Sequence, residues 1–187
     1  METSDSDEQL ASRVQKGETA AYGELVARYQ DKLLRYGNRF LVSPDDAEDV
    51  VQDIFLKAYE NIQSFDTERR FSPWIYRIAH NEFINALKKR KAARTIFAFD
   101  IDTLFPYLTA EETADEGALA RDLRQTLEQH LSKLDAKYRE PLILYYLEEM
   151  DYKEISDILQ IPVSTVGVRL ARGRSILKLT AEKEHRI

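Results

Sequence analysis

The sequence predicts an all-α protein in which a flexible linker joins two small helical domains. Apolar residues recur at spacings of three and four almost everywhere along the 187 residues, and strict alternation over the length of a strand is hard to find. Residues 94–120 break this repeat with a block of aromatics followed by small polar and acidic residues, a composition typical of a linker. We therefore expect domains at residues 1–93 and 121–187 on either side of an acidic linker.

The helical repeat divides the chain into candidate helices. The clearest start is Ser43-Pro44, where serine can cap the helix, proline fits its first turn, and the acids that follow lie at the positive end of the helix dipole. Pro141 is expected to kink its helix or to delay the start. The candidates cover residues 5–16, 19–41, 44–62, 71–91, 117–132, 136–149, 152–159 and 163–180.

The net charge of −6 conceals two basic islands in an acidic background. Residues 63–94 hold eight Lys/Arg and three Asp/Glu, and residues 151–187 hold seven and five. Residues 1–62 and 95–122 each carry a net charge of −6. Local fields are therefore better guides to function than the total charge.

Composition argues against several classes of protein. The chain has no cysteine, which excludes disulfides and thiolate metal sites and gives no sign of an oxidising compartment. The first residues are acidic and polar, unlike a signal peptide, and no run approaches the roughly 18 apolar residues of a membrane span. The histidines lie far apart, the glycines form no phosphate-binding loop, and no nucleophile has a paired base. We expect a soluble, cytoplasmic protein with no catalytic residue, metal or cofactor.

Residues 71–91 form an amphipathic pattern on a helical wheel. One face carries Trp74, Arg77, Asn81, Asn85 and Lys88, and the opposite face carries Ile75, Ile78, Ala79, Phe83, Ala86 and Leu87. Cations neutralise phosphates, amides meet base edges and aromatic rings stack on unpaired bases, so the polar face suits nucleic acid. A solvated helix with Trp74 in the core fits about equally well. A helix on a membrane surface fits less well, because the apolar face is needed for the core.

The stretch before this helix, QSFDTERRF at residues 63–71, is predicted to be a polar loop. Loops held by rigid helices often carry recognition residues. Arg69 and Arg70, at the end of the loop, could be recognition residues or, equally, plain surface charges.

The stretch YKEISDILQIPVSTVGVRLARGRSILK, residues 152–178, predicts a helix-turn-helix. A short apolar helix is followed by the turn Gln160-Ile161-Pro162 and a longer helix. Residues 163–178 contain four cations and no acid, which favours an approach to DNA. An ordinary helical hairpin is the alternative.

The acidic start PDDAEDVVQDIFLKAYENI, residues 44–62, does not match a calcium-binding loop. Its acids do not have the spacing of that loop, the glycine of that loop is missing, and Pro44 places the acids on a helix. It is either a solvated helix start or a docking face for a basic partner.

Three motifs in this order resemble bacterial sigma factors of the extracytoplasmic-function (ECF) group, in the sigma-70 family. They are DAEDVVQDIFLKAYENIQSFD, RRFSPWIYRIAHNEFINALKKRK and, after the acidic linker, LDAKYREPLILYYLEEMDYKEISDILQIPVSTVGVRLARGR. The resemblance extends from about residue 7 to residue 178. It implies a sigma-2 domain and a sigma-4 helix-turn-helix domain that bind core RNA polymerase and direct it to particular promoters.

The resemblance also implies roles for individual residues. Docking on the clamp helices of the polymerase's largest subunit would use Asp46, Glu48, Asp49, Gln52, Asp53 and Phe55. The melted minus-ten element would be recognised and held by Ser64, Phe65, Asp66, Arg69, Arg70, Trp74, Arg77, Asn81, Asn85 and Lys88. The duplex minus-thirty-five element would be read by Ser164, Thr165, Val168, Arg169, Arg172 and Arg174. Other implied partners are the flap of the second-largest subunit and an anti-sigma factor, and no small-molecule substrate is implied.

The predicted recognition helix departs from the common family pattern of Gly-Thr-Val-Lys followed by Ser-Arg. This chain has Ser164-Thr165-Val166-Gly167-Val168-Arg169 instead. One cation is missing, and Gly167 lowers helix propensity by about 1 kcal/mol relative to alanine.

Two other functions account for part of the pattern. A stand-alone helix-turn-helix regulator that binds duplex DNA as a dimer would need an effector pocket or a dimer face in the N-terminal half. A scaffold or anti-sigma-like protein would leave the two cationic faces unexplained.

Overall fold

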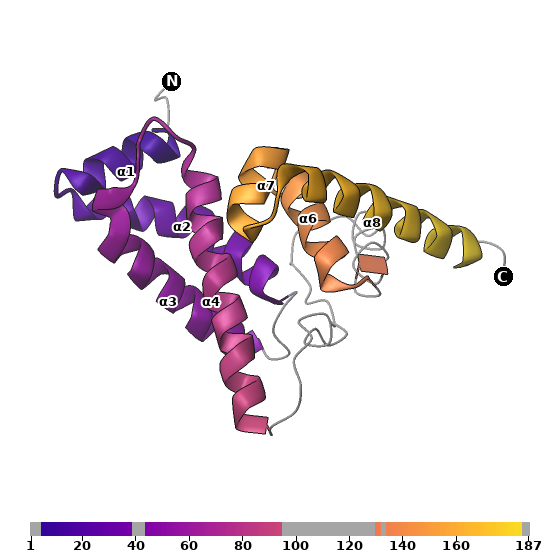
Figure 1. The fold of residues 1–187 in the computed structure, drawn as a ribbon. Helices are drawn as coiled ribbons and strands as arrows, with labels where there is room; N and C mark the ends of the chain where they lie inside the picture. The colour runs from indigo at the N-terminus through magenta and orange to yellow at the C-terminus, as the bar shows by residue number, and fades with distance from the viewer. Residues whose placement is uncertain (1–4, 39–43, 95–129, 132–133, 185–187) are drawn as a thin grey trace. The chain divides into compact units, whose positions relative to one another are not determined.

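The computed structural model describes residues 5–38, 44–94, 130–131 and 134–184 (Figure 1). Within these ranges the regular structure is helical and no strand occurs, so the all-α prediction is confirmed. The elements are α1 (Asp7–Gln15), α2 (Thr19–Asn38), α3 (Pro44–Asn61), the 3-10 turn η1 (Ile62–Ser64), α4 (Phe71–Arg94), α6 (Ala136–Tyr146), α7 (Tyr152–Leu159) and α8 (Val163–Glu184).

The chain divides into two compact units. The first carries α1 to α4, and the second carries α6, α8 and all of α7 except its last three residues. The predicted linker at 94–120 lies outside the described residues apart from Arg94, which ends α4. The exact domain limits therefore stay a prediction.

The first unit encloses a core rich in aromatic rings. The Tyr36 ring on α2 meets the rings of Tyr76 and Phe83 on α4 edge-on, at centroid distances of 5.2 and 5.9 Å. All three side chains are fully buried. Gly37 permits this approach, because a Cβ atom at that position would lie 2.4 Å from the Phe83 ring. The depth at which α4 packs on α2 therefore depends on the absence of a side chain at position 37.

The second unit contains the predicted helix-turn-helix. Helix α7 begins with a capping box, in which the Asp151 carboxylate accepts the Glu154 backbone N–H and the Glu154 carboxylate accepts that of Asp151. It ends at Leu159 and is capped by Gln160, whose φ of 55° is left-handed. The Ser156 hydroxyl closes the turn by donating to the Ile161 carbonyl. Buried apolar side chains of this unit include Leu142, Ile143, Leu144, Ile155, Val166 and Leu170.

The helix boundaries agree with the predicted ones to within a few residues where they are described. Pro141 lies inside α6, which starts at Ala136 without delay. That helix ends at Tyr146 rather than at 149, because the chain turns at Glu149, whose φ is 53°. Most of the predicted helix at 117–132 and the predicted cap Ser43 lie outside the described residues.

Candidate nucleic-acid interface

Helix α4 has the two faces that the sequence predicted. Arg77, Asn81, Asn85 and Lys88 are exposed along one side. On the other side Ile75, Ala79, Phe83 and Leu87 are buried, while Ile78 and Ala86 are half-buried. These four side chains are therefore outside the core and turned to solvent.

Trp74, at the start of α4, is neither fully in the core nor fully on the polar face, the two alternatives that the sequence allowed. Its ring contacts Phe65 and Phe71 at centroid distances of 5.2 and 5.4 Å, yet the side chain is only half-buried. It is thus part of an aromatic cluster, and part of its side chain remains exposed to solvent.

Phe65 and Phe71 fasten the two ends of the loop before α4. They are 5% and 0% exposed, and their rings meet edge-on at 5.4 Å. Between them Asp66, Glu68, Arg69 and Arg70 are exposed and Thr67 is half-buried. We expected Phe65 to contact DNA directly, but its burial makes it a support for Trp74 and the loop. We call residues 65–71 the aromatic-pinned loop.

Asp66 helps to order the aromatic-pinned loop. The Asp66 carboxylate accepts the Glu68 backbone N–H at 3.1 Å and lies 3.4 Å from the Arg69 guanidinium. That ion pair is exposed, so it contributes at most about 1 kcal/mol and leaves Arg69 available to a partner. Ser64 is also used locally, since its hydroxyl donates to the Asn61 carbonyl at 2.7 Å.

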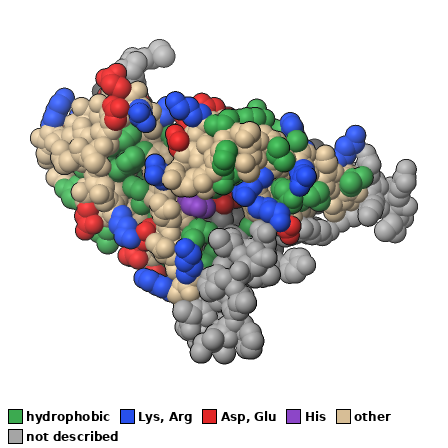
Figure 2. Space-filling model, in the orientation of Figure 1, with side chains coloured by type: hydrophobic (Ala, Val, Ile, Leu, Met, Phe, Trp, Pro, Cys, Tyr) green, Lys and Arg blue, Asp and Glu red, His purple; other side chains and the backbone are tan. Residues whose placement is uncertain are grey.

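Helix α8, the predicted recognition helix, presents a second candidate face. Ser164, Val168, Arg172 and Arg174 are exposed, and Thr165 and Arg169 are half-buried. In the view of Figure 2, Lys and Arg side chains lie beside exposed apolar ones along α8. Such a mixture of cations and small apolar side chains can contact both phosphates and thymine methyl groups.

Sequence reasoning missed three tyrosines in the second unit. The Tyr145 ring meets the rings of Tyr146 and Tyr152 edge-on, at 4.8 and 5.4 Å. Arg174 donates a hydrogen bond to the Tyr146 hydroxyl at 3.2 Å, which raises the pKa of the guanidinium above its ordinary value. The adjacent pair Tyr145-Tyr146 was visible in the sequence, but only the fold shows that it lies next to Arg174 of α8.

The acidic helix α3 carries a mixed acidic and apolar surface. Glu48, Asp49, Gln52 and Asp53 are exposed. The side chain of Asp46 lies outside the described part of the chain, and Phe55, expected to contact the polymerase, is buried at 9% exposure. Two residues that the sequence analysis did not select, Leu56 and Tyr59, are 63% and 43% exposed on the same helix.

The described residues contain no group of three or more His, Cys, Asp or Glu side chains that could hold a metal ion. Among the helices of the described part, none is long and apolar enough to cross a membrane.

Fold and surface define an all-helical protein with a helix-turn-helix in its second unit. Residues 25–93 match the family Sigma-70 region 2, and residues 124–177 match Sigma-70 region 4. The ECF RNA polymerase sigma factor SigW of Bacillus subtilis (strain 168) is 37% identical over 171 residues, which are 89% of this chain and 91% of SigW. The ECF RNA polymerase sigma-E factor of Escherichia coli (strain K12) is 32% identical over 177 residues, 92% of each chain. The chain therefore belongs to the ECF sigma factors of the sigma-70 family, which confirms the predicted resemblance.

Solved structures agree with this fold. CnrH in complex with the cytosolic domain of CnrY superposes with a TM-score of 0.68 at 28% identity, covering 96% of this chain and 99% of CnrH. The sigma factor RpoE in complex with the anti-sigma factor NepR, from Bartonella quintana, has a TM-score of 0.67 at 22% identity, over 86% and 96% of the two chains. The latter likeness concerns the fold alone.

Proposed function

We propose that this sigma factor binds core RNA polymerase and selects promoters by two different readings of DNA. Helix α8 reads the minus-thirty-five element as duplex, and the aromatic-pinned loop with the exposed face of α4 holds the minus-ten element as melted strand. The protein has no enzymatic activity of its own in this role. The observation that carries the proposal is the loop, whose ends are fixed by buried Phe65 and Phe71 beneath a half-exposed tryptophan.

Capture of a melted strand needs a surface that is ready before the strand arrives. Unstacking a base costs a few kcal/mol, which stacking and pocket contacts must offset. A loop already held in shape loses little conformational entropy on binding. Arg69, Arg70 and the cations of α4 supply the charge that attracts the phosphates.

Duplex reading needs only a helix that fits the major groove. Exposed Ser164 and Val168 lie in the first two turns of α8, the part of a recognition helix that contacts base edges. Arg172 and the half-buried Arg169 are the candidates for contacts to guanine or phosphate.

Polymerase docking is assigned to α3. Its exposed acids match a basic partner, and Leu56 and Tyr59 add apolar area beside them, the combination that gives an interface both orientation and affinity. We propose the clamp helices of the largest subunit as the partner of α3 and the flap of the second-largest subunit as a partner of the second unit. An anti-sigma factor is proposed as a regulator by resemblance to the ECF group, and CnrH, at 28% identity, was solved in complex with the cytosolic domain of CnrY.

Run-off transcription with reconstituted holoenzyme tests the proposal. Purified chain is mixed with core polymerase and a genomic promoter library, and the expected result is initiation at a limited set of promoters. The chain alone should bind the same duplexes weakly, because the two units become effective only when the polymerase tethers them. No transcript from the library, together with tight duplex binding by the chain alone, would overturn the proposal in favour of a stand-alone regulator.

A further inference from the structure

Helix α1 lies outside both matched regions, which begin at residue 25 and residue 124. It nevertheless contacts the chain on both sides of the aromatic-pinned loop. At the loop's start, the Gln15 side-chain amide donates to the carbonyls of Ile62 and Phe65, at 2.7 and 2.8 Å. At the loop's end, the Glu8 carboxylate accepts the backbone N–H of Phe71 at 3.0 Å.

These contacts give hydrogen-bond partners to backbone groups at both ends of the loop, and the Ile62 carbonyl also accepts the Phe65 backbone N–H at 3.1 Å. Gln15 uses both N–H donors of one amide on two carbonyls, which fixes the direction in which the chain enters the loop. Phe71 begins α4, and the first N–H groups of a helix have no partner inside that helix. A carboxylate at this end is also favoured by the helix dipole. Both loop ends are therefore held by one nine-residue helix.

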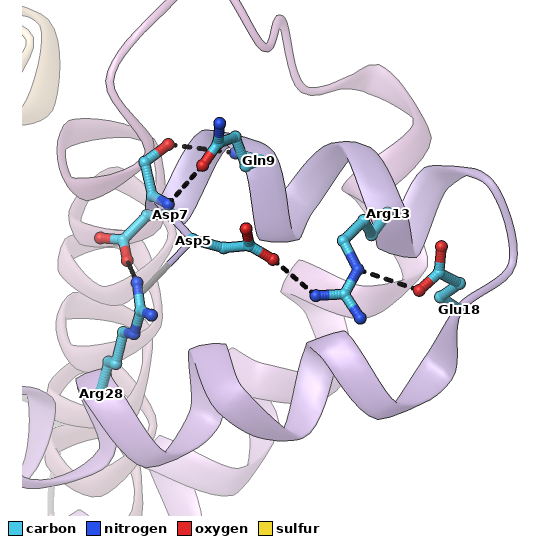
Figure 3. Close-up of polar contacts among 7 residues, drawn as sticks. Asp5, Asp7, Gln9, Arg13, Glu18 and Arg28 are labelled. Atoms are coloured by element: carbon cyan, nitrogen blue, oxygen red, sulfur yellow. Dashed lines mark hydrogen bonds and ion pairs between the residues drawn. The ribbon is translucent and has the colours of Figure 1, made fainter. Parts of the chain in front are cut away.

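Helix α1 is itself joined to the core at the end that carries Glu8. The Asp7 carboxylate accepts hydrogen bonds from Arg28 at 2.7 Å and from the Tyr29 hydroxyl (Figure 3 shows the Arg28 contact). Burial, followed by the contact with Asp7, raises the pKa of Tyr29 well above its ordinary value, so its hydroxyl remains a donor. The Tyr29 ring in turn meets the Phe71 ring at 5.4 Å. Polar and aromatic contacts thus meet at the same loop end.

We propose that Gln15 and Glu8 are positioning residues, which set the shape of the aromatic-pinned loop for the minus-ten strand. The inference rests on the proposed function, because it presumes that this loop reads DNA. Neither residue needs to touch the strand. Their effect is on selectivity at the minus-ten element, and selectivity at the minus-thirty-five element does not depend on them.

The test compares variants in a pool of promoter duplexes randomised in both elements. Holoenzyme reconstituted with each variant transcribes the pool, and sequencing of the transcribed templates gives the base preference at every position. Gln15→Ala and Glu8→Ala are expected to lower minus-ten preference about fivefold, an effect on the scale of one hydrogen bond. Glu8→Gln keeps an oxygen acceptor for the Phe71 N–H and should retain most of the preference.

Arg13→Gln is the matched control on the same helix. Arg13 pairs with Asp5 at 2.6 Å and with Glu18 at 2.9 Å and makes no described contact with the loop (Figure 3). Its loss perturbs α1 without altering the contacts of Gln15 or Glu8. We expect unchanged preferences at both elements, even if the melting temperature falls as much as in Gln15→Ala.

Hydrogen exchange of the Phe71 amide gives a readout that is independent of transcription. Exchange should accelerate in Glu8→Ala and remain slow in Glu8→Gln. If wild type shows a minus-ten preference and folded Gln15→Ala keeps it in full, the positioning inference is overturned while the proposed function stands. If wild type itself shows no minus-ten preference, the proposed reading of that element fails first. A parallel loss at both elements would indicate general destabilisation and would also overturn the inference.

Discussion

The predicted recognition helix of the second unit presents all its candidate DNA contacts on one helix. The aromatic-pinned loop of the first unit is instead held in shape by contacts from several segments of the chain. The interior of α8 pairs its own backbone groups, and Val166 and Leu170 are buried on its inner side. The loop has no such internal ladder. Its ends are fixed by buried rings from within the loop and by polar side chains from α1.

The difference follows from what each surface is proposed to bind. A duplex has a fixed shape, so a rigid rod with correctly spaced side chains is sufficient. A melted strand has no fixed shape, and the protein must supply the order. We therefore expect substitutions on α8 to act on one DNA position at a time, and the loop to be sensitive to residues that never touch DNA.

The largest expected effect is on stability, at two glycines where helices approach closely. Gly37→Ala would place a Cβ 2.4 Å from the Phe83 ring, and we expect the first unit to lose about 2–3 kcal/mol. Gly173→Ala in α8 would place a Cβ 2.8 Å from a methyl group of buried Leu142 and 3.3 Å from the Tyr138 carbonyl oxygen, and a loss of about 1 kcal/mol is expected. Urea denaturation followed by fluorescence of the single tryptophan, Trp74, reports on the first unit, and circular dichroism reports on both.

Gly23→Ala is the control for these glycines, since nothing lies within 4 Å of its Cβ position. It should be neutral or stabilising by up to about 1 kcal/mol. Equal effects of Gly37→Ala and Gly23→Ala would show that the close approach of α4 to α2 is not a constraint.

The second effect concerns the arginines of the recognition helix. Replacing Arg169 and Arg172 by alanine should weaken promoter capture by holoenzyme by about 2 kcal/mol, with little change in polymerase binding. The salt dependence of capture should become shallower by about one unit of slope for each phosphate that is no longer neutralised. Lys153→Ala, an exposed cation on α7, is the control and should change neither. Equal losses from the control would mean that charge alone, and not the face of α8, matters.

A smaller effect is expected for the acidic face of α3. Asp49→Lys combined with Asp53→Lys should reduce affinity for core polymerase about tenfold, because exposed charge pairs contribute of the order of 1 kcal/mol. Glu24→Lys with Asp31→Lys makes the same charge change on exposed positions of α2. Affinity measured by co-elution and titration should fall only for the α3 pair. Unchanged binding of the α3 variant would remove this docking assignment.

The smallest effect is expected at Gly167 in the recognition helix. A Cβ there would lie 3.5 Å from the Tyr152 ring, an ordinary contact distance. Gly167→Ala should therefore stabilise α8 by up to about 1 kcal/mol through helix propensity. The urea midpoint followed by circular dichroism should rise, while the midpoint followed by Trp74 fluorescence should stay the same. A destabilised second unit would indicate that the helix needs glycine for a reason other than space.

The sequence predicted most of the helices because each helix is specified by residues that are close together in the sequence. The 3.6-residue apolar repeat and the turn Gln160-Ile161-Pro162 are properties of neighbouring residues. The same locality separated the polar face of α4 from its apolar face. Membership of the ECF sigma factors also followed from the order of motifs along the chain.

Only the tertiary structure decided which side chains of these motifs are available. Phe65 and Phe55 belong to motifs that the sequence assigned to binding, but the fold buries both side chains. Leu56 and Tyr59 are the reverse case, apolar residues that remain exposed in the described structure. The contacts of Gln15 and Glu8 join residues 50 and 63 positions apart. A periodic pattern reports the face of a helix, whereas burial and long-range hydrogen bonds depend on what the fold brings against that face.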